Sequence, residues 1–433
     1  MTSKTEEAYV WIWLPGQREP VVAGRLSQEK DQLLFNYGQS YLRREDAISI
    51  YEPELPLKAG RIELLPRMDM PSCIRDGSPD AWGRRVIINH VTGKSADGVD
   101  HKDLDELTYL LLSGSDRIGA LDFQASPVDY QSRDPRQATL KELLSASELV
   151  EQGIPLSPEL DQALNHGSSI GGARPKASLT SEGRKFIAKF SGSTDTYSVV
   201  KAEYIAMSLA KDVGIAVAEV ELTQALGKDV LLIERFDREP AEGRGSEQGG
   251  WHRKSMVSGL TILGLPEMEA RYASYELLAE RIRYQFTKPG DTLRELFKRM
   301  VFNILVGNTD DHARNHAAFW DGKELSLTPA YDICPQGRTG EEASQAMNIS
   351  GESKLSQLGN CLSASAAFHL SEEQAIEIIE HQVRTIAEKF SATCSAAQLT
   401  EVDQRLFWRR QFLNPFCFYG LSEELRLRLT ASL

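Results

Sequence analysis

Two aspartates and an asparagine in the carboxyl-terminal half of the sequence occur in the order that phosphate transfer requires. Asp310 and Asn315 lie in the polar run 307–315, and Asp332 follows farther along the chain. In a phosphotransferase, one Asp orients the acceptor hydroxyl and takes its proton, an Asn holds magnesium, and a second Asp bridges the metal and the phosphates. Magnesium prefers such hard oxygen ligands. The order therefore predicts Asp310 as the catalytic residue and Asn315 and Asp332 as magnesium ligands.

His312, inside the same run, leaves other interpretations open. With Asp310 and Asp311 it offers a ligand set for a metallohydrolase, although no second histidine cluster accompanies it. The protein-kinase order His-Arg-Asp is absent, but Asp-x-His-x-x-Asn is the arrangement of aminoglycoside-type phosphotransferases, and His312 fits that arrangement. Each of these Asp and Asn residues, taken singly, is also a common turn former. We favour phosphate transfer because the residues occur together, after an apolar helical stretch.

A lysine at the end of an apolar strand offers a contact to phosphate. Residues 186–189 read Phe-Ile-Ala-Lys, similar to the kinase strand whose lysine holds the α and β phosphates and pairs with a helical glutamate. Glu203 lies in a helix predicted over 195–212, on a face of small and apolar residues. A carboxylate there needs a cation, so we expect Lys189 and Glu203 to pair. Alternatively, Lys189 extends to solvent from the strand end.

Residues 230–238 form a hydrophobic strand that ends in charge, as a hinge between two lobes would. The backbone groups of Glu234 and Phe236 could pair with adenine there, and Asp237 could accept hydrogen bonds from ribose hydroxyls. Any strand that leaves a core can end in polar residues, so this signal counts only together with the others.

A glycine-containing segment upstream could surround a phosphate. Residues 166–177 contain the adjacent Gly171 and Gly172 followed by Lys176, which can present backbone N–H groups and one positive charge to phosphate oxygens. The segment matches neither Walker A nor the G-x-G-x-x-G pattern. A plain glycine turn is therefore an equally good interpretation of this segment taken alone.

The elements around these residues predict a mixed α/β (α+β) chain in three parts. Strand-prone residues and turn pairs open the chain, so we expect a β-rich subdomain over 1–130. Strands and helices alternate over 131–254, as in the smaller lobe of a kinase. Residues 255–433 are almost wholly helical apart from a hairpin over 317–327, and a capping box at Ser371 should begin a long helix.

The composition of the 433 residues excludes several classes of protein. The chain has 49 Lys+Arg against 62 Asp+Glu, a formal charge of −13, whereas a protein that grips nucleic acid by itself needs a basic face. Its 41% hydrophobic residues exclude disorder as the main state. We also expect no membrane span, because no run of about 18 apolar residues occurs. Five scattered cysteines fit neither a disulfide framework nor a zinc site, which favours a cytoplasmic protein.

Four segments, taken in chain order, resemble the HipA toxins of bacterial toxin–antitoxin systems. They read Ser-Ile-Gly-Gly-Ala-Arg-Pro-Lys (169–176), Ile-Glu-Arg-Phe-Asp-Arg (233–238), Asn-Thr-Asp-Asp-His-Ala-Arg-Asn (308–315) and Thr-Pro-Ala-Tyr-Asp-Ile (328–333). The front end is similar to the family's amino-terminal subdomain in Gly24-Arg25-Leu26, Leu55-Pro56-Leu57 and Arg117-Ile118-Gly119-Ala120-Leu121. The resemblance covers nearly the whole chain.

This resemblance implies an ATP- and magnesium-dependent serine/threonine protein kinase with a fold distantly related to protein kinases. By matched position, Asp310 would be the catalytic Asp, and Asn315 and Asp332 would hold magnesium. The implied nucleotide contacts are Ser169, Gly171, Gly172, Ala173, Lys176, Lys189, Glu203, Glu234, Phe236, Asp237, His312, Asn315 and Asp332. Ser169 matches the serine that the family autophosphorylates, and Ser168 is an adjacent competitor. Phosphate beside the glycines would repel the nucleotide.

The resemblance also implies partners. One is a small helix-turn-helix antitoxin dimer that binds operator DNA and holds the toxin on its flanks. The other is a protein substrate, an aminoacyl-tRNA synthetase, whose phosphorylation starves translation and makes cells dormant. Because this chain is acidic, a basic antitoxin would supply the grip on DNA. Two alternatives remain: a catalytically silent scaffold or co-repressor, and a small-molecule kinase of the aminoglycoside type.

Overall fold

The computed structural model describes residues 6–92, 104–133, 138–165, 170, 172–241, 250–337, 340, 342–431 and 433. The chain forms two compact units. We call them the amino-terminal unit (Met1–Thr194, Thr223–Val257 and Phe319–Lys323) and the carboxy-terminal unit (Asp195–Leu222, Ser258–Ala318 and Glu324–Leu433). The boundaries near residues 130 and 254 that the sequence suggests stay a prediction.

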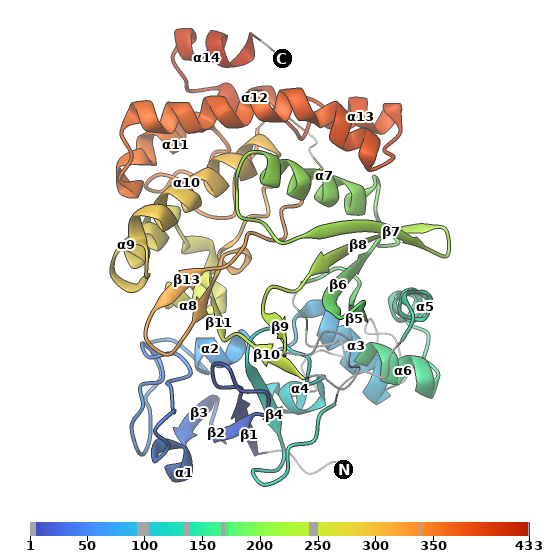
Figure 1. The fold of residues 1–433 in the computed structure, drawn as a ribbon, viewed down its shortest axis with the longest axis vertical. Coiled ribbons are helices and arrows are strands. Elements are labelled where there is room, and N and C mark those ends of the chain that lie inside the picture. The colour runs from blue at the N-terminus through green and yellow to red at the C-terminus, as the bar shows by residue number, and fades with distance from the viewer. Residues whose placement is uncertain are drawn as a thin grey trace. The chain divides into compact units, whose positions relative to one another are not determined.

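The amino-terminal unit begins with a four-stranded sheet, which confirms the predicted β-rich front end (Figure 1). Its order is β3-β2-β1-β4, and the three strand pairs are antiparallel. The strands are β1 (Glu7–Ile12), β2 (Val21–Glu29), β3 (Gln32–Tyr37) and β4 (Leu121–Gln124), and the helices between β3 and β4 are α1 (Gln39–Leu42), α2 (Ser72–Arg75), α3 (Ala81–Thr92) and α4 (Glu106–Leu112). Val10, Leu26 and Phe35 are fully buried.

A second four-stranded sheet carries the candidate phosphate contacts. Its order is β5-β6-β8-β7, from β5 (Lys176–Ser181), β6 (Arg184–Phe190), β7 (Val220–Ala225) and β8 (Lys228–Glu234). Helices α5 (Leu140–Glu151) and α6 (Pro158–Asn165) share a hydrophobic core with it, in which Leu144 and Leu164 pack with Phe186 and Trp82. A short hairpin pairs β9 (Arg238–Pro240) with β10 (Trp251–Arg253). Alternating apolar residues in the strands explain this buried face.

The carboxy-terminal unit is predominantly helical. Its helices are α7 (Val199–Asp212), α8 (Gly259–Ile262), η3 (Glu267–Tyr272), α9 (Tyr275–Gln285), α10 (Pro289–Leu305), η4 (Ala313–Asn315), α11 (Leu358–Ala364), η5 (Ser365–Phe368), α12 (Glu372–Ala396), α13 (Glu401–Phe407), η6 (Pro415–Phe418) and α14 (Glu423–Thr430). Helix α12 packs against α7 and α10 (Figure 1). Ser371 and Gln374 form the predicted capping box at its start.

The predicted hairpin over 317–327 is confirmed by β12 (Ala317–Trp320) and β13 (Leu325–Leu327), which join β11 (Met256–Ser258) in a sheet of order β11-β12-β13. All five cysteines are buried and free, as their scattered positions predict. Within the described residues, no helix combines the length and apolar character needed to cross a membrane.

Candidate active site

The polar run 307–315 begins where helix α10 ends, at a glycine that no other residue could replace without strain. Gly307 has φ +69°, and a Cβ atom there would lie 2.7 Å from the carbonyl oxygen of Gln411. The carbonyl of Gly307 accepts hydrogen bonds from the backbone N–H groups of Thr309 (3.1 Å) and Gln336 (3.0 Å). Glycine adopts this left-handed conformation at no steric cost, so the chain can turn sharply into the loop.

Asp310 is exposed at the tip of this loop, and Asn315 is bonded to it. The carbonyl oxygen of Asp310 accepts from the backbone N–H of His312 at 2.9 Å and from Nδ2 of Asn315 at 3.2 Å. Asn315 is only 8% exposed. Since the N–H side of its amide is used within the loop, the Oδ1 side is the one that could bind a cation.

Asp332 is the third member of the predicted set, and the structure brings its segment to the same loop. The Tyr331 hydroxyl donates to the carbonyl oxygen of Arg314 at 2.6 Å, so the residues directly before Asp332 and directly before Asn315 are in contact. Asp332 itself is half-buried with φ +57°, a left-handed conformation that Asp tolerates better than most residues. Backbone strain of this kind is concentrated at functional sites.

A buried polar network lies beneath Asp310 and was not predicted from the sequence. Asp311 is 1% exposed and accepts hydrogen bonds from the hydroxyl of Tyr275 and from Nε2 of His316, the latter at 2.9 Å. Nδ2 of Asn303 also reaches the Tyr275 hydroxyl, at 3.5 Å. Burial raises the pKa of Tyr275 well above its ordinary value, and the Asp311 carboxylate raises it further, so this hydroxyl remains a donor. The network anchors the loop, and the side chain of Asp310 remains exposed to solvent.

Gly259 is bonded to the other end of the loop, and the sequence did not indicate this role either. It follows Ser258, whose side chain caps α8 by accepting from the backbone N–H of Thr261 at 3.2 Å. The backbone N–H of Gly259 donates to the carbonyl oxygen of His316 at 2.6 Å, and a Cβ atom at Gly259 would lie 2.6 Å from the carbonyl oxygen of Ala313. A glycine at a helix start is a weak signal alone, because only the tertiary fold shows what approaches it.

The hydrolase interpretation finds little support in this geometry. The Asp311 carboxylate is engaged by Tyr275 and His316, and His312 is half-buried. In the part of the chain that the structure describes, no group of three or more His, Cys, Asp or Glu side chains could hold a metal ion. Magnesium in a kinase needs no such cage, because waters and substrate phosphates supply most of its ligands.

Two buried lysines face one another on the second sheet. Lys176 of β5 and Lys189 of β6 are directly opposite in the antiparallel register and are only 4% and 9% exposed. Side chains of directly opposite residues lie on the same face of a sheet, where like charges are destabilising. The register therefore places the two positively charged side chains on one face of the sheet.

Gly172 lies against the Lys176 ammonium group. With φ +109°, Gly172 has a conformation that favours glycine, and a Cβ atom there would collide with Nζ of Lys176. Trp82 of α3 holds both residues: its backbone N–H donates to the Gly172 carbonyl at 3.3 Å, and its Nε1 donates to the Lys176 carbonyl at 2.9 Å. The predicted juxtaposition of a glycine and a lysine is therefore present, and Trp82 is a positioning residue that the sequence did not indicate.

The predicted hinge residues have different environments. Glu234 ends β8 and accepts from Nη1 of Arg184 at 3.2 Å, while Phe236 packs edge-on against Phe319 with ring centroids 5.9 Å apart. Both side chains are half-buried. They remain accessible enough to line a ligand site.

Asp237, by contrast, is 2% exposed and surrounded by donors. Its oxygens accept from Nε of Arg235 (2.9 Å), Nη1 of Arg238 (2.9 Å) and the backbone N–H of Gly119 (2.8 Å). Burial works to raise the pKa of Asp237, but the two guanidinium groups outweigh it and lower the pKa to about 2. This environment favours a structural part for Asp237, which ties β8 to the loop before β4.

The other predicted residues are placed as follows. Ala173 is exposed, and Glu203 is 2% exposed on α7, along the face that also buries Val199, Ala206 and Ala210. Lys189 belongs to the amino-terminal unit and Glu203 to the carboxy-terminal unit, so their pairing stays a prediction. Ser168, Ser169 and Gly171 lie outside the described residues.

Comparisons with known proteins place this arrangement in a class. The fold superposes on a solved structure with a TM-score of 0.71 at 19% identity, over 96% of this chain and 99% of the other. That structure is the Shewanella oneidensis toxin–antitoxin system HipA, HipB and its operator DNA complex. The fold is thus mixed α/β and HipA-like.

Family models and relatives agree with the fold. The model described as HipA N-terminal domain matches residues 12–124, and the model described as HipA-like C-terminal domain matches residues 168–390. The chain therefore belongs to the HipA family. It is 26% identical over 353 residues to the Sinorhizobium fredii protein Y4mE, covering 74% of this chain and 76% of that protein. It is also 26% identical over 189 residues to the serine/threonine-protein kinase toxin HipA of Shewanella oneidensis, covering 38% and 42% of the two chains.

Proposed function

We propose that this protein is an ATP- and magnesium-dependent serine/threonine protein kinase that acts as the toxin of a toxin–antitoxin pair. The observation that carries the proposal is the loop 307–316, which exposes Asp310 while Asp311 anchors it from below. A general base must be accessible and rigidly held. Asp310 is the accessible residue, and the buried Asp311 holds the loop in place. Asp310 would orient the acceptor hydroxyl and take its proton.

The residues of the amino-terminal unit would bind the nucleotide. The two cross-strand lysines, Lys176 and Lys189, supply positive charge for phosphate oxygens, and Gly172 lets the backbone approach them closely. The backbone groups at Glu234 and Phe236 would pair with adenine. The ribose contact suggested for Asp237 is the weakest part of this assignment, because its carboxylate already accepts from Arg235, Arg238 and Gly119.

Magnesium would be held by the Oδ1 of Asn315 and the carboxylate of Asp332. Both groups are hard oxygen donors, and the contact between Tyr331 and Arg314 keeps their segments together. Bound there, the ion would supply charge neutralisation for the phosphate oxygens. Ser169, with Ser168 as the adjacent competitor, would be the autophosphorylated residue, and its phosphate would repel the nucleotide.

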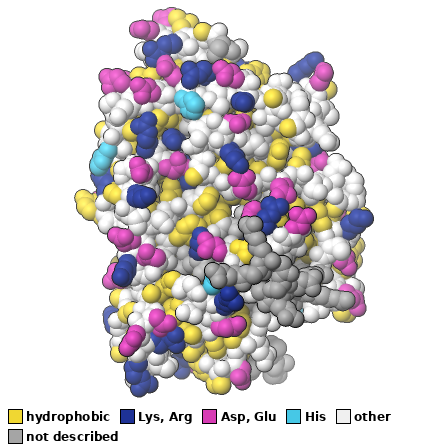
Figure 2. Space-filling model, in the orientation of Figure 1, with side chains coloured by type: hydrophobic (Ala, Val, Ile, Leu, Met, Phe, Trp, Pro, Cys, Tyr) yellow, Lys and Arg dark blue, Asp and Glu magenta, His cyan; other side chains and the backbone are white. Residues whose placement is uncertain are grey.

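The partners follow from the solved relative, which is a complex of HipA with HipB and operator DNA. A HipB-like helix-turn-helix antitoxin would bind this chain and carry the basic surface that grips DNA. The net charge of −13 of this chain agrees with DNA binding by the antitoxin rather than by the kinase. On the face drawn in Figure 2, acidic and basic side chains of the described residues are interspersed rather than gathered into one basic region. An aminoacyl-tRNA synthetase would be the protein substrate in the cytoplasm.

The test is the pair of variants Asp310→Asn and Asp31→Asn, which change one exposed aspartate each to its uncharged isostere. Incubated with labelled ATP and magnesium, the wild type and Asp31→Asn should transfer phosphate to protein, and Asp310→Asn should be slower by about a hundredfold or more. Expression of the first two, but not the third, should arrest growth. Equal arrest by all three would refute the kinase proposal and leave the silent scaffold or co-repressor as the alternative. Label that appears only on small acceptors would establish a small-molecule kinase.

A further inference from the structure

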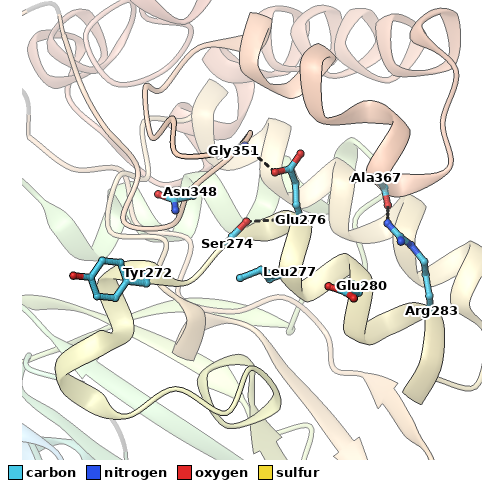
Figure 3. Close-up of a pocket in the computed structure, with 9 residues that line it drawn as sticks. All are labelled: Tyr272, Ser274, Glu276, Leu277, Glu280, Arg283, Asn348, Gly351 and Ala367. Carbon is cyan, nitrogen blue, oxygen red and sulfur yellow. Dashed lines mark hydrogen bonds between the residues drawn. The ribbon is translucent and has the colours of Figure 1, made fainter.

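A hollow of about 330 Å³ lies in the carboxy-terminal unit between helix α9 and the segment 344–355. It is lined by Tyr272, Ser274, Glu276, Leu277, Glu280, Arg283, Asn348, Gly351 and Ala367. Figure 3 shows Leu277 and Glu280 on the same side of α9. Tyr272 is 54% and Leu277 47% exposed, so the hollow offers apolar surface to solvent, and exposed tyrosine and leucine in a concave site mark binding surfaces.

The walls of the hollow are already fixed. The carboxylate of Glu276 accepts from the backbone N–H of Gly351 at 2.8 Å, and Nη2 of Arg283 donates to the carbonyl oxygen of Ala367 at 2.8 Å (Figure 3). The backbone N–H of Tyr275 donates to the carbonyl oxygen of Asn348 at 3.0 Å. A site held in this way loses little conformational freedom when a ligand binds.

Both walls are bonded to the loop that carries Asp310. On the α9 side, the Tyr275 hydroxyl donates to the carboxylate of Asp311. On the other side, the backbone N–H of Ala346 donates to the carbonyl oxygen of Thr309 at 3.1 Å. The residues before and after Asp310 are thus each hydrogen-bonded to one wall, so the hollow and the loop that exposes Asp310 belong to one bonded framework.

The acidic side chains that line the hollow favour a ligand that carries a positive charge. Glu276 and Glu280 are one helical turn apart on α9, a spacing at which like charges repel one another. Within the described residues, Glu280 forms no ion pair, and the Arg283 guanidinium, which also lines the hollow, donates to a backbone carbonyl. The Glu276 carboxylate is bonded to the backbone N–H of Gly351 (Figure 3), so Glu280 is the carboxylate that a basic side chain entering the hollow would pair with.

We propose that this hollow, defined by the nine residues above, docks the segment of the protein substrate that flanks its acceptor serine or threonine. The segment carries a lysine or arginine for Glu280, and an apolar side chain for Leu277 and Tyr272. The inference rests on the proposed kinase function and adds a substrate class to it.

The test is a positional peptide library with a central serine and one fixed residue at each flanking position, phosphorylated by the full chain. The variants are Glu280→Lys, in the hollow, and Glu377→Lys, the same change at an exposed position of α12. The wild type and Glu377→Lys should prefer lysine or arginine at one or two positions, and Glu280→Lys should lose that preference by about five- to tenfold. Peptides without a basic residue should be phosphorylated equally by all three.

A preference that is absent from the wild type, or that survives in Glu280→Lys, would overturn the proposal. Direct binding of fluorescent arginine-fixed and glutamate-fixed peptide pools separates this failure from failure of the kinase function. Binding that favours the arginine pool and is lost only in Glu280→Lys supports the docking site even if no phosphate is transferred. Equal binding of the two pools refutes it.

Discussion

The adjacent residues Asp310 and Asp311 allow the same substitution to test two opposite roles. Asp310 is exposed, whereas Asp311 is 1% exposed and accepts hydrogen bonds from Tyr275 and His316. We predict that Asp311→Ala lowers the free energy of unfolding of the full chain and that Asp310→Ala does not. Asp310→Ala should instead abolish phosphate transfer by a folded protein.

The size of the expected loss in unfolding free energy follows from the two hydrogen-bond donors that Asp311→Ala leaves without an acceptor. With the Asp311 carboxylate removed, the Tyr275 hydroxyl and the His316 Nε2–H are buried without their acceptor. Each such loss costs about 1–3 kcal/mol, so the pair amounts to about 2–6 kcal/mol. Asn303 cannot compensate, because its Nδ2 is itself a donor to the Tyr275 hydroxyl. An exposed substitution such as Asp310→Ala normally changes stability by no more than about 0.5 kcal/mol.

Urea unfolding of the two variants and the wild type measures the difference directly, since the change in midpoint multiplied by the slope is the change in stability. If Asp311→Ala does not accumulate as folded protein, Asp311→Asn keeps the shape and one acceptor oxygen and should lose roughly half as much. The reasoning is refuted if Asp311→Ala is as stable as the wild type. Equal destabilisation by Asp310→Ala would refute the assignment of Asp310 as the exposed member.

Three further predictions concern the phosphate site, the loop turn and pH. Gly172→Ala should weaken nucleotide binding, because the new Cβ atom displaces the Lys176 ammonium group. Gly183→Ala is the control: Gly183 also has a positive φ but has open space around it, so this change should lower only the stability of the fold. Nucleotide titration of the two variants distinguishes these effects. Gly307→Ala should slow phosphate transfer more than it weakens nucleotide binding. It should also cost about 1–3 kcal/mol in urea unfolding, because a backbone carbonyl lies 2.7 Å from the new Cβ. The Asp237 carboxylate has a lower pKa when folded (about 2) than when unfolded, so the stability it contributes is complete above about pH 4 and is lost as the pH falls toward 2. Urea midpoints measured from pH 7 to pH 2.5 should show that decline, and Asp237→Asn should reduce it by on the order of 2 kcal/mol.

Much of the secondary structure could be predicted because it depends on local patterns. The hairpin over 317–327 and the long helix that begins at the Ser371 capping box could both be predicted, because turn residues and caps act within a few positions of the chain. The order of the residues that we propose for phosphate transfer could be read from the sequence for the same reason. Asp310 and Asn315 share one short loop, and their contact is nearly local.

The residues that hold the site were not predictable in the same way. Trp82 contacts Gly172 and Lys176 from a distant helix, and Tyr275 reaches Asp311 from another. Nothing in the spacing of these residues along the chain indicates that they meet. Their pairing is decided by how the helices and sheets pack, which places a donor where a buried acceptor needs one.

The sequence by itself determined the residue types that we propose for the chemistry and the family to which the chain belongs. The tertiary structure decided which of two adjacent aspartates is exposed and which is buried and bonded to Tyr275 and His316. It also decided that Lys176 and Lys189 stand opposite one another, and that Asp237 is enclosed by arginines. The physical reason is that burial and hydrogen-bond partners come from contacts between distant segments, whereas residue type and spacing are properties of the chain alone.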